Sequence, residues 1–305
     1  MTDKKVIGID LGATNIRGAV VSGGAAGSGG ASVGEAASVG GRALSGIVTA
    51  RIRSEGSVED VLGDIHQVID ALMTGEIAAI GIGVPSVVDV DEGIVYDVQY
   101  IPSWKEVPLR RLLEAKYGKP VLVNNDANCF ALGEYYFGKE RKAASMVGLT
   151  IGTGLGGGII INHKLFAGYN CGAGEFGLLP YKDNILEYYC SGSFFRNVYG
   201  LDGLEVFEAA KRGEARALEL YGELGTHVGQ AIKAVIYTYD PELIVLGGSV
   251  SQAYDWFKEA MWSEIRTLAY GQSAQRIRIA VSELANSGIL GAAALYYNAL
   301  LKANP

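Results

Sequence analysis

Short apolar runs alternate with longer amphipathic stretches along this chain. The short runs are rich in β-branched residues and end at glycine, proline, asparagine or aspartate, which is typical of buried strands; they cover residues 6–10, 16–21, 44–52, 77–84, 120–123, 144–151, 159–162, 243–246 and 277–281. Apolar positions with helical spacing predict helices over residues 57–73, 109–117, 127–137, 204–211, 215–239, 253–267 and 289–301. Because strands and helices alternate, the predicted fold class is α/β.

A pattern of strand, glycine turn and strand occurs twice. The first copy contains Asp10-Leu-Gly-Ala-Thr-Asn15, and the second contains Gly152-Thr-Gly-Leu-Gly-Gly-Gly158. We interpret the repetition as two related lobes that each present one glycine turn to a shared cleft. The predicted lobes are residues 1–118 plus 289–305 and residues 119–288, so that the last helix returns to the first lobe.

Composition and charge exclude several classes of protein. The chain has 305 residues, 43 glycines and a net charge of −7, without a block of Lys and Arg, which argues against a nucleic-acid partner. We find neither an apolar leader before residue 6 nor a run long enough to span a bilayer, so we expect a cytoplasmic protein with no membrane partner. The three cysteines are expected to be reduced, and the Gly/Ala/Ser-rich residues 22–46 to form a flexible or hairpin segment at the surface.

The glycine turns are candidate phosphate sites. Phosphate oxygens need backbone N–H donors at close range, which glycine permits, and Thr14 and Thr153 would add hydroxyl donors. Asp10 beside the first turn is explained if a hydrated Mg²⁺ lies between its carboxylate and the phosphates. Neither turn is a Walker loop, since no Gly-Lys-Ser/Thr follows. The alternative for a single turn is a plain β-hairpin; two turns together with Gly247-Gly248 favour a nucleotide.

Three acidic residues are candidates for substrate chemistry. Asp126 follows a predicted buried strand and could accept the proton of a substrate hydroxyl during phosphoryl transfer; the alternative is a helix N-cap. Glu175 and Glu187 lie in a loop region and could accept hydrogen bonds from the hydroxyls of a sugar; the alternative is a pair of solvated charges. The three histidines are scattered and are not expected to bind metal.

Read in order, these motifs resemble the ROK family of sugar kinases and repressors, which has the two-lobed actin-like ATPase (ribonuclease H-like) fold. The resemblance covers nearly the whole chain and is carried by residues 8–15, 81–85, Pro102 with Trp104, 124–128, 152–158, 174–177 and 246–248. It implies mixed sheets flanked by helices, a cleft between the lobes, ATP and Mg²⁺ as cofactors, and a homodimer. It also implies an ATP-dependent phosphotransferase of the glucokinase or hexokinase type that acts on a small sugar. Family repressors carry a helix-turn-helix before the first glycine turn, which we do not find here.

The resemblance also implies residue roles. Asp126 would be the general base. The substrate side would comprise Asn125, Asp126, Glu175 and Glu187, with Pro85 and Ser86; the Mg-phosphate clamp would comprise Asp10, Gly12, Ala13, Thr14, Asn15, Thr153 and Gly154; and Gly247 and Gly248 would form the turn near the adenosine.

The departures from the family pattern cluster on the substrate side. Leu178 stands where the family usually has His, and residues 179–186 contain no Cys, so the family's zinc site is predicted to be absent. Ser86 replaces a usual Gly, and Tyr100 a usual Asn. A sensor of sugar or nucleotide with little turnover and a kinase of a non-sugar hydroxyl compound stay open as alternatives. The sequence identifies neither the sugar nor the hydroxyl that is phosphorylated.

Overall fold

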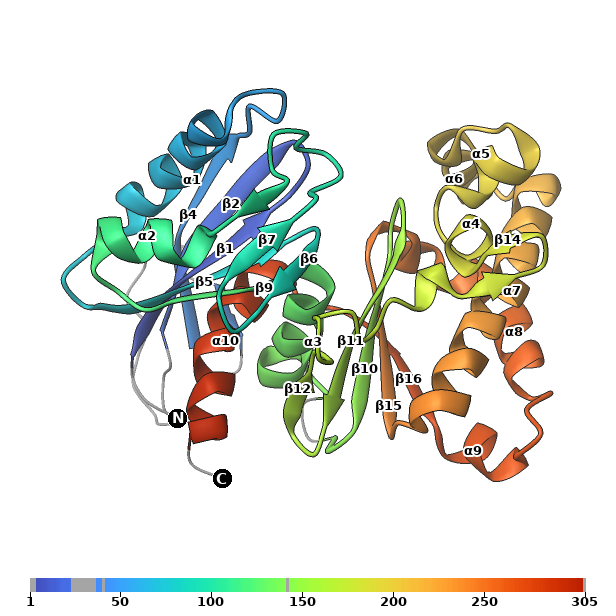
Figure 1. Ribbon diagram of the computed structural model, residues 1–305. Coiled ribbons are helices and arrows are strands. Elements are labelled where there is room, and N and C mark those ends of the chain that lie inside the picture. Colours follow the sequence, from blue (N-terminus) through green and yellow to red (C-terminus); the bar gives the residue numbers. More distant parts are fainter. Residues whose placement is uncertain (1–3, 23–36, 40–41, 141–142, 304–305) are drawn as a thin grey trace. The chain divides into compact units, whose positions relative to one another are not determined.

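A computed structural model describes residues 4–22, 37–39, 42–140 and 143–303 (Figure 1). Most of the glycine-rich segment, residues 23–36 and 40–41, lies outside the described residues. The contacts divide the chain into two compact units: the first is Met1–Lys142, Lys164–Ala173 and Glu283–Pro305, and the second is Ala143–His163 and Gly174–Ser282. We call them the first and the second unit and describe each by itself.

The first unit contains a six-stranded sheet of order β3-β4-β2-β1-β5-β9. Its strands are β1 (Lys5–Leu11), β2 (Asn15–Ser22), β3 (Ala37–Val39), β4 (Arg42–Arg51), β5 (Ile77–Val84) and β9 (Val121–Asn125). β5 runs parallel to both β1 and β9, so these three strands end at the same edge of the sheet. A small sheet of β6 (Val87–Asp89), β7 (Ile94–Tyr96) and β8 (Glu106–Val107) follows β5 along the chain.

Isoleucine and glycine alternate along β1, and this alternation explains how helices pack on the two faces of the sheet. Ile7 and Ile9 point to the face where they join a buried core with Ile65 and Ile69 of α1 (Val58–Leu72). The opposite face presents Gly8 of β1 and Gly81 of β5, where a Cβ would clash with the backbone of α10 (Ser287–Ala303). Glycine therefore lets α10 lie directly on the sheet (Figure 1).

The remaining helices of the first unit pack beside the strand ends. They are α2 (Leu109–Tyr117) and α3 (Asp126–Phe137). α3 contacts α10 through Gly133 and Gly291, where added Cβ atoms would meet the backbone of the other helix. This close packing holds the start of α3 near the ends of β5 and β9.

The second sheet has the order β12-β11-β10-β15-β16. Its strands are β10 (Met146–Ile151), β11 (Leu155–Ile161), β12 (Lys164–Phe166), β15 (Leu243–Gly247) and β16 (Arg278–Val281), of which all but β12 belong to the second unit. The second unit also contains the hairpin strands β13 (Pro180–Tyr181) and β14 (Asn184–Ile185) and the 3-10 helices η1 (Phe176–Leu178) and η2 (Ser249–Ala253). Its α-helices are α4 (Leu186–Cys190), α5 (Phe194–Tyr199), α6 (Gly203–Lys211), α7 (Ala215–Tyr239), α8 (Tyr254–Ile265) and α9 (Gly271–Arg276).

The alternation of strands and helices and both strand–turn–strand repeats are confirmed. By its contacts, α10 belongs to the first unit. The lobe boundary that we predicted between residues 118 and 119 differs from the division that the contacts give. β9 pairs with β5 and α3 packs on α10, so residues 119–140 belong to the first unit, and Asp126 with them. β11 begins at Leu155 rather than residue 159, because the glycines at 156–158 pair with β10 in spite of their low strand propensity.

Candidate functional site

The residues that the sequence singled out fall on both units. The first unit carries Asp10, residues 12–15, Pro85, Ser86, Asn125 and Asp126; the second carries Thr153, Gly154, Glu175, Glu187, Gly247 and Gly248. In the first unit they gather where β1, β5 and β9 end. In the second they gather around the turn between β10 and β11.

Asp10 is held at the end of β1 against the first turn of α10. A Cβ added to Gly288 would lie 2.9 Å from both Cγ and Oδ2 of Asp10, so only glycine leaves the carboxylate this position. Burial raises the pKa of Asp10, and the positive charge of Arg17 opposes that rise. The guanidinium of Arg17 itself donates a hydrogen bond to Asn286. A bound cation would therefore favour the ionised carboxylate of Asp10.

The first glycine turn is a hairpin whose tip faces outward. The N–H of Gly12 donates to the carbonyl oxygen of Asn15 (3.0 Å), and the N–H of Ile52 donates to that of Thr14 (3.0 Å). Ala13, Thr14 and Asn15 are exposed. The plain hairpin considered as an alternative is thus the local structure, and it leaves the Thr14 side chain accessible.

The start of α3 separates the roles of Asn125 and Asp126. The Oδ1 of Asn125 accepts hydrogen bonds from the N–H groups of Ala127 (2.8 Å) and Asn128 (3.3 Å), so Asn125 is the N-cap of this helix. The alternative role considered for Asp126 is therefore filled by its neighbour. Asp126 is exposed in the first helical turn, and its Oδ1 lies 2.8 Å from the N–H of Ala127.

Asn125 also ties the helix to the loop after β5. Its Nδ2 donates to the carbonyl oxygen of Ser86 (3.2 Å), and the hydroxyl of Ser86 donates to the carbonyl oxygen of Tyr96. The N–H of Ser86 donates a hydrogen bond to the carbonyl oxygen of Val84, two residues earlier (2.9 Å). The Asn125 side chain thus links the start of α3, where Asp126 lies, to the loop after β5.

A buried polar network lies beneath Asn125. The Oδ1 of Asn124 accepts hydrogen bonds from the N–H of Asn125 (2.8 Å), the Nδ2 of Asn128 (2.9 Å) and the Sγ of Cys171 (3.4 Å). Asn124, Asn128 and Cys171 are each less than 10% exposed. This network was not predicted from the sequence, because Asn124 lies on β9, Asn128 on α3 and Cys171 more than forty residues further along the chain.

In the second unit, the second glycine turn is bound to Glu187. Within the turn, the N–H of Gly152 donates to the carbonyl oxygen of Gly154 (3.0 Å). The Oε2 of Glu187 accepts a hydrogen bond from the N–H of Leu155 (2.9 Å), and a Cβ on Gly154 would lie 2.5 Å from the same oxygen. Glu187 is therefore not a solvated loop charge.

Glu175 shares the electrostatic environment of Glu187. Although the residue as a whole is exposed, the protein around its carboxylate raises the pKa of Glu175, and the negative charge of Glu187 adds to that rise. Gly174 before it has a φ of +99°, and a side chain there would clash with the backbone of Gly157 on β11. The structure thus brings Glu175 and Glu187 together beside one turn.

The hairpin β13–β14 joins the two glutamates, and aromatic side chains hold its tip. The hydroxyl of Tyr181 lies 3.0 Å from the Nδ1 of the buried His227, and Tyr189 donates to Asp183. Burial lowers the pKa of His227, and the positive charge of Lys182 contributes. Within the described residues, no group of three or more His, Cys, Asp or Glu side chains could hold a metal ion.

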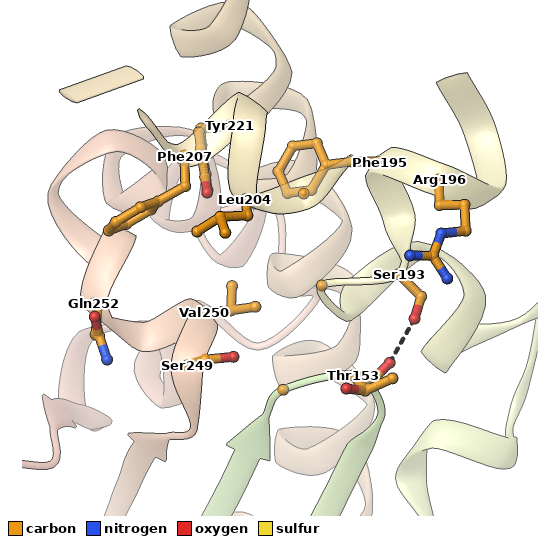
Figure 2. A pocket seen from close by; sticks show the side chains of 13 residues that line it. Thr153, Ser193, Phe195, Arg196, Leu204, Phe207, Tyr221, Ser249, Val250 and Gln252 are labelled. Carbon is orange, nitrogen blue, oxygen red and sulfur yellow. Dashed lines mark hydrogen bonds between the residues drawn. The ribbon is translucent and has the colours of Figure 1, made fainter. Parts of the chain in front are cut away.

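A pocket of about 340 Å³ opens beside the second glycine turn (Figure 2). Its lining comes from the turn, the loop before α5, and α5, α6, α7 and η2, and comprises Gly152, Thr153, Gly192, Ser193, Phe195, Arg196, Gly203, Leu204, Phe207, Tyr221, Ser249, Val250 and Gln252. Two hydrogen bonds link the loop to the turn. The N–H of Gly192 donates to the carbonyl oxygen of Gly152 (2.7 Å), and the hydroxyl of Ser193 donates to the carbonyl oxygen of Thr153 (2.8 Å).

Gly247 and Gly248 lie next to this pocket but do not line it. Gly248 has a φ of +84° and leads into η2, which supplies Ser249, Val250 and Gln252. Of the residues in the predicted turn, Gly152 and Thr153 line the pocket. The other lining residues were not predicted, because they come from many separate segments of the chain.

Comparison with known proteins gives concordant results. The sequence model of the ROK family matches residues 29–299. The glucokinase of Thermotoga maritima is 29% identical over 97% of this chain and 98% of its own length, and the N-acetyl-D-glucosamine kinase of Vibrio cholerae is 34% identical over 67% and 75%. The crystal structure of a ROK family glucokinase from Streptomyces griseus, in complex with glucose and AMPPNP, covers 95% of this chain and 98% of its own, with a TM-score of 0.74 and 26% identity.

Proposed function

The chain belongs to the ROK family and has its two-lobed actin-like ATPase fold, and from this we propose that it is an ATP-dependent sugar kinase. In the proposed reaction, the oxygen of a sugar hydroxyl attacks the γ-phosphorus of ATP. Its proton passes to the carboxylate of Asp126, and the bond between the γ-phosphorus and the bridging oxygen breaks to release ADP. One observation supports this most directly: Asn125 serves as the helix cap, which leaves Asp126 exposed at the common ends of three strands.

The nucleotide is assigned to the pocket beside the second glycine turn. An aromatic and apolar end, formed by residues such as Leu204 and Phe207, suits a base, and the turn with Thr153 suits phosphates. The neighbouring Gly154, Gly247 and Gly248 would bring backbone close to the ligand. The nucleotide analogue in the glucokinase complex supports a nucleotide as the ligand.

The first glycine turn is assigned to the terminal phosphates. The exposed residues 13–15 and the backbone of Gly12 would bind them, and Asp10 is the carboxylate that would hold Mg²⁺ through water. Bound Mg²⁺ would neutralise charge on the phosphate oxygens. The carboxyl of Asp10 fits this role because it lies at the strand end with Gly288 packed against it.

The substrate is assigned to the carboxylates. Glu175 and Glu187 are acceptors suited to neighbouring hydroxyls, and Asn125, Pro85 and Ser86 shape the surroundings of Asp126. The glucose in the complex and the N-acetyl-D-glucosamine kinase relative support a sugar without selecting one.

We expect a cytoplasmic homodimer, which light scattering would test. None of the described helices is long and apolar enough to span a membrane.

A coupled assay of ADP release over a panel of hexoses and amino sugars tests the proposal. We expect turnover with at least one sugar and a loss of roughly 10²–10⁴-fold in kcat for Asp126→Asn. Asp255→Asn is the matched control, since Asp255 is also an exposed aspartate in the first turn of a helix, α8. No ADP release with any sugar refutes the sugar kinase. Stabilisation by sugar and ATP without turnover favours the sensor instead.

A further inference from the structure

Arg196 lies at the phosphate end of the proposed nucleotide pocket. It is in α5, and it lines the pocket together with Ser193 and Thr153. Figure 2 shows these three residues on one side of the pocket, whereas Phe207 and Gln252 are on the other. The pocket therefore has a polar end that contains one guanidinium and an opposite end that is mostly apolar.

The backbone that carries Arg196 is fixed to the glycine turn. Both hydrogen bonds between the turn and the loop before α5 come from residues three and four positions earlier, Ser193 and Gly192. At the other end of this helix, the N–H of Gly200 donates to the carbonyl oxygen of Arg196 (2.9 Å). A phosphate bound at the turn would thus meet a guanidinium whose main chain is already positioned.

Charge distinguishes Arg196 from the other lining residues. None of them is Asp, Glu or Lys, so Arg196 is the one charged side chain of the pocket, in a chain of net charge −7. No described residue forms an ion pair with it, whereas the guanidinium of Arg17, near the first turn, already donates to Asn286. Residues 8–15 and 152–158 contain no Lys.

We propose that Arg196 is a binding residue for the phosphates of the nucleotide and supplies the positive charge that the glycine turn lacks. This rests on the proposed function, in that the ligand is a nucleotide. A guanidinium forms charge-assisted hydrogen bonds with phosphate oxygens, and its planar fork allows two at once. Arg196 would act in binding rather than in the transfer step.

Calorimetric titration of ATP, ADP and adenosine with Mg²⁺ tests this on the full chain. For Arg196→Gln we expect a rise of about 5- to 30-fold in the Kd of ATP, from charge-assisted hydrogen bonds at a partly solvated site. The rise should be smaller for ADP and absent for adenosine, and it should shrink at high ionic strength. Arg196→Lys should recover part of the loss. Arg212→Gln is the control, because Arg212 is exposed, pairs with Glu214 and does not line the pocket.

Two results overturn the inference and leave the kinase proposal standing: Arg196→Gln binds ATP as tightly as the parent, or it loses ATP and adenosine equally, which indicates a deformed pocket. If the parent chain itself binds none of the three ligands, the proposed function fails, and the inference fails with it.

Discussion

The contact between Gly288 and Asp10 makes a substitution at a residue outside the sequence motifs informative. In Gly288→Ala, the new Cβ would lie 2.9 Å from Cγ and Oδ2 of Asp10 and 3.1 Å from Oδ1. Ordinary contacts between such atoms are longer, so the carboxylate has to move by several tenths of an ångström. The backbone of α10 has little room to move instead, because Gly8 and Gly81 pack against it.

The magnitudes for stability and activity differ. Overpacking costs about 1–3 kcal/mol, and replacing Gly by Ala in a helix returns up to about 1 kcal/mol, so the free energy of unfolding should fall by about 0–3 kcal/mol. Activity is more sensitive, since a misplacement of about 1 Å can cost 10²-fold. We therefore expect kcat to fall by roughly 10- to 100-fold and the Mg²⁺ concentration for half-maximal activity to rise.

The assay is ADP release as a function of Mg²⁺, together with urea denaturation of the same preparations. Gly222→Ala is the control, because Gly222 lies within α7 and an added Cβ there has nothing within 4 Å. That variant should be as stable as the parent or slightly more stable, with unchanged kinetics. A Gly288→Ala enzyme with the parent's kcat and Mg²⁺ dependence would refute the assignment of Asp10.

Three further substitutions test two side-chain hydrogen bonds and the neighbouring carboxylates of Glu175 and Glu187. Asn125→Ala should lower the free energy of unfolding by about 1 kcal/mol through loss of the N-cap, whereas Asn125→Asp should keep the cap, which chemical denaturation would measure. Tyr181→Phe should cost about 1 kcal/mol in the same experiment, because His227 loses its partner at Nδ1; an unchanged midpoint would contradict this. Glu187→Gln should lower the pKa of Glu175, measured by NMR of its carboxyl carbon. Because the pKa of Glu175 is raised in the folded protein, ionised Glu175 lowers the free energy of unfolding at pH values above this pKa. The loss disappears as the pH falls through the raised pKa to the usual pKa of a glutamate. Glu187→Gln should therefore weaken the dependence of the free energy of unfolding on pH just above the usual pKa of a glutamate.

The local pattern of residues was sufficient for much of the fold. β-branched runs and helical spacing located the long elements, and the glycines at 152–154 located the turn between β10 and β11. The partner of a strand is not encoded locally. β9 was predicted as a strand, but its pairing with β5, which places Asp126 in the first unit, comes from long-range contacts. The short elements β6, β7, β8, β13 and β14 are two or three residues long and carry no readable periodicity.

Some parts of the candidate site could likewise be predicted from the local sequence, and others could not. Motif residues with a backbone role could be predicted, because a glycine turn or a helix start leaves a mark in a few consecutive residues. The pocket could not, since its lining combines residues from Gly152 to Gln252 that meet only after α5, α6, α7 and η2 have packed. The division of labour between Asn125 and Asp126 also needed the structure, because either residue type caps helices well.

The second glycine turn contacts both the proposed nucleotide pocket and a proposed substrate ligand. Gly152 and Thr153 line the nucleotide pocket, and the N–H of Leu155, two residues later, is held by Glu187, a proposed substrate ligand. A hydrogen bond to an ionised acceptor is stronger than one between neutral groups, so the charge of Glu187 helps to set the conformation of this turn. A ligand that competes for the Glu187 carboxylate therefore acts on the same short segment as a phosphate bound at the turn. Sugar binding and nucleotide binding should for this reason be energetically coupled through Glu187, even where the two ligands do not touch.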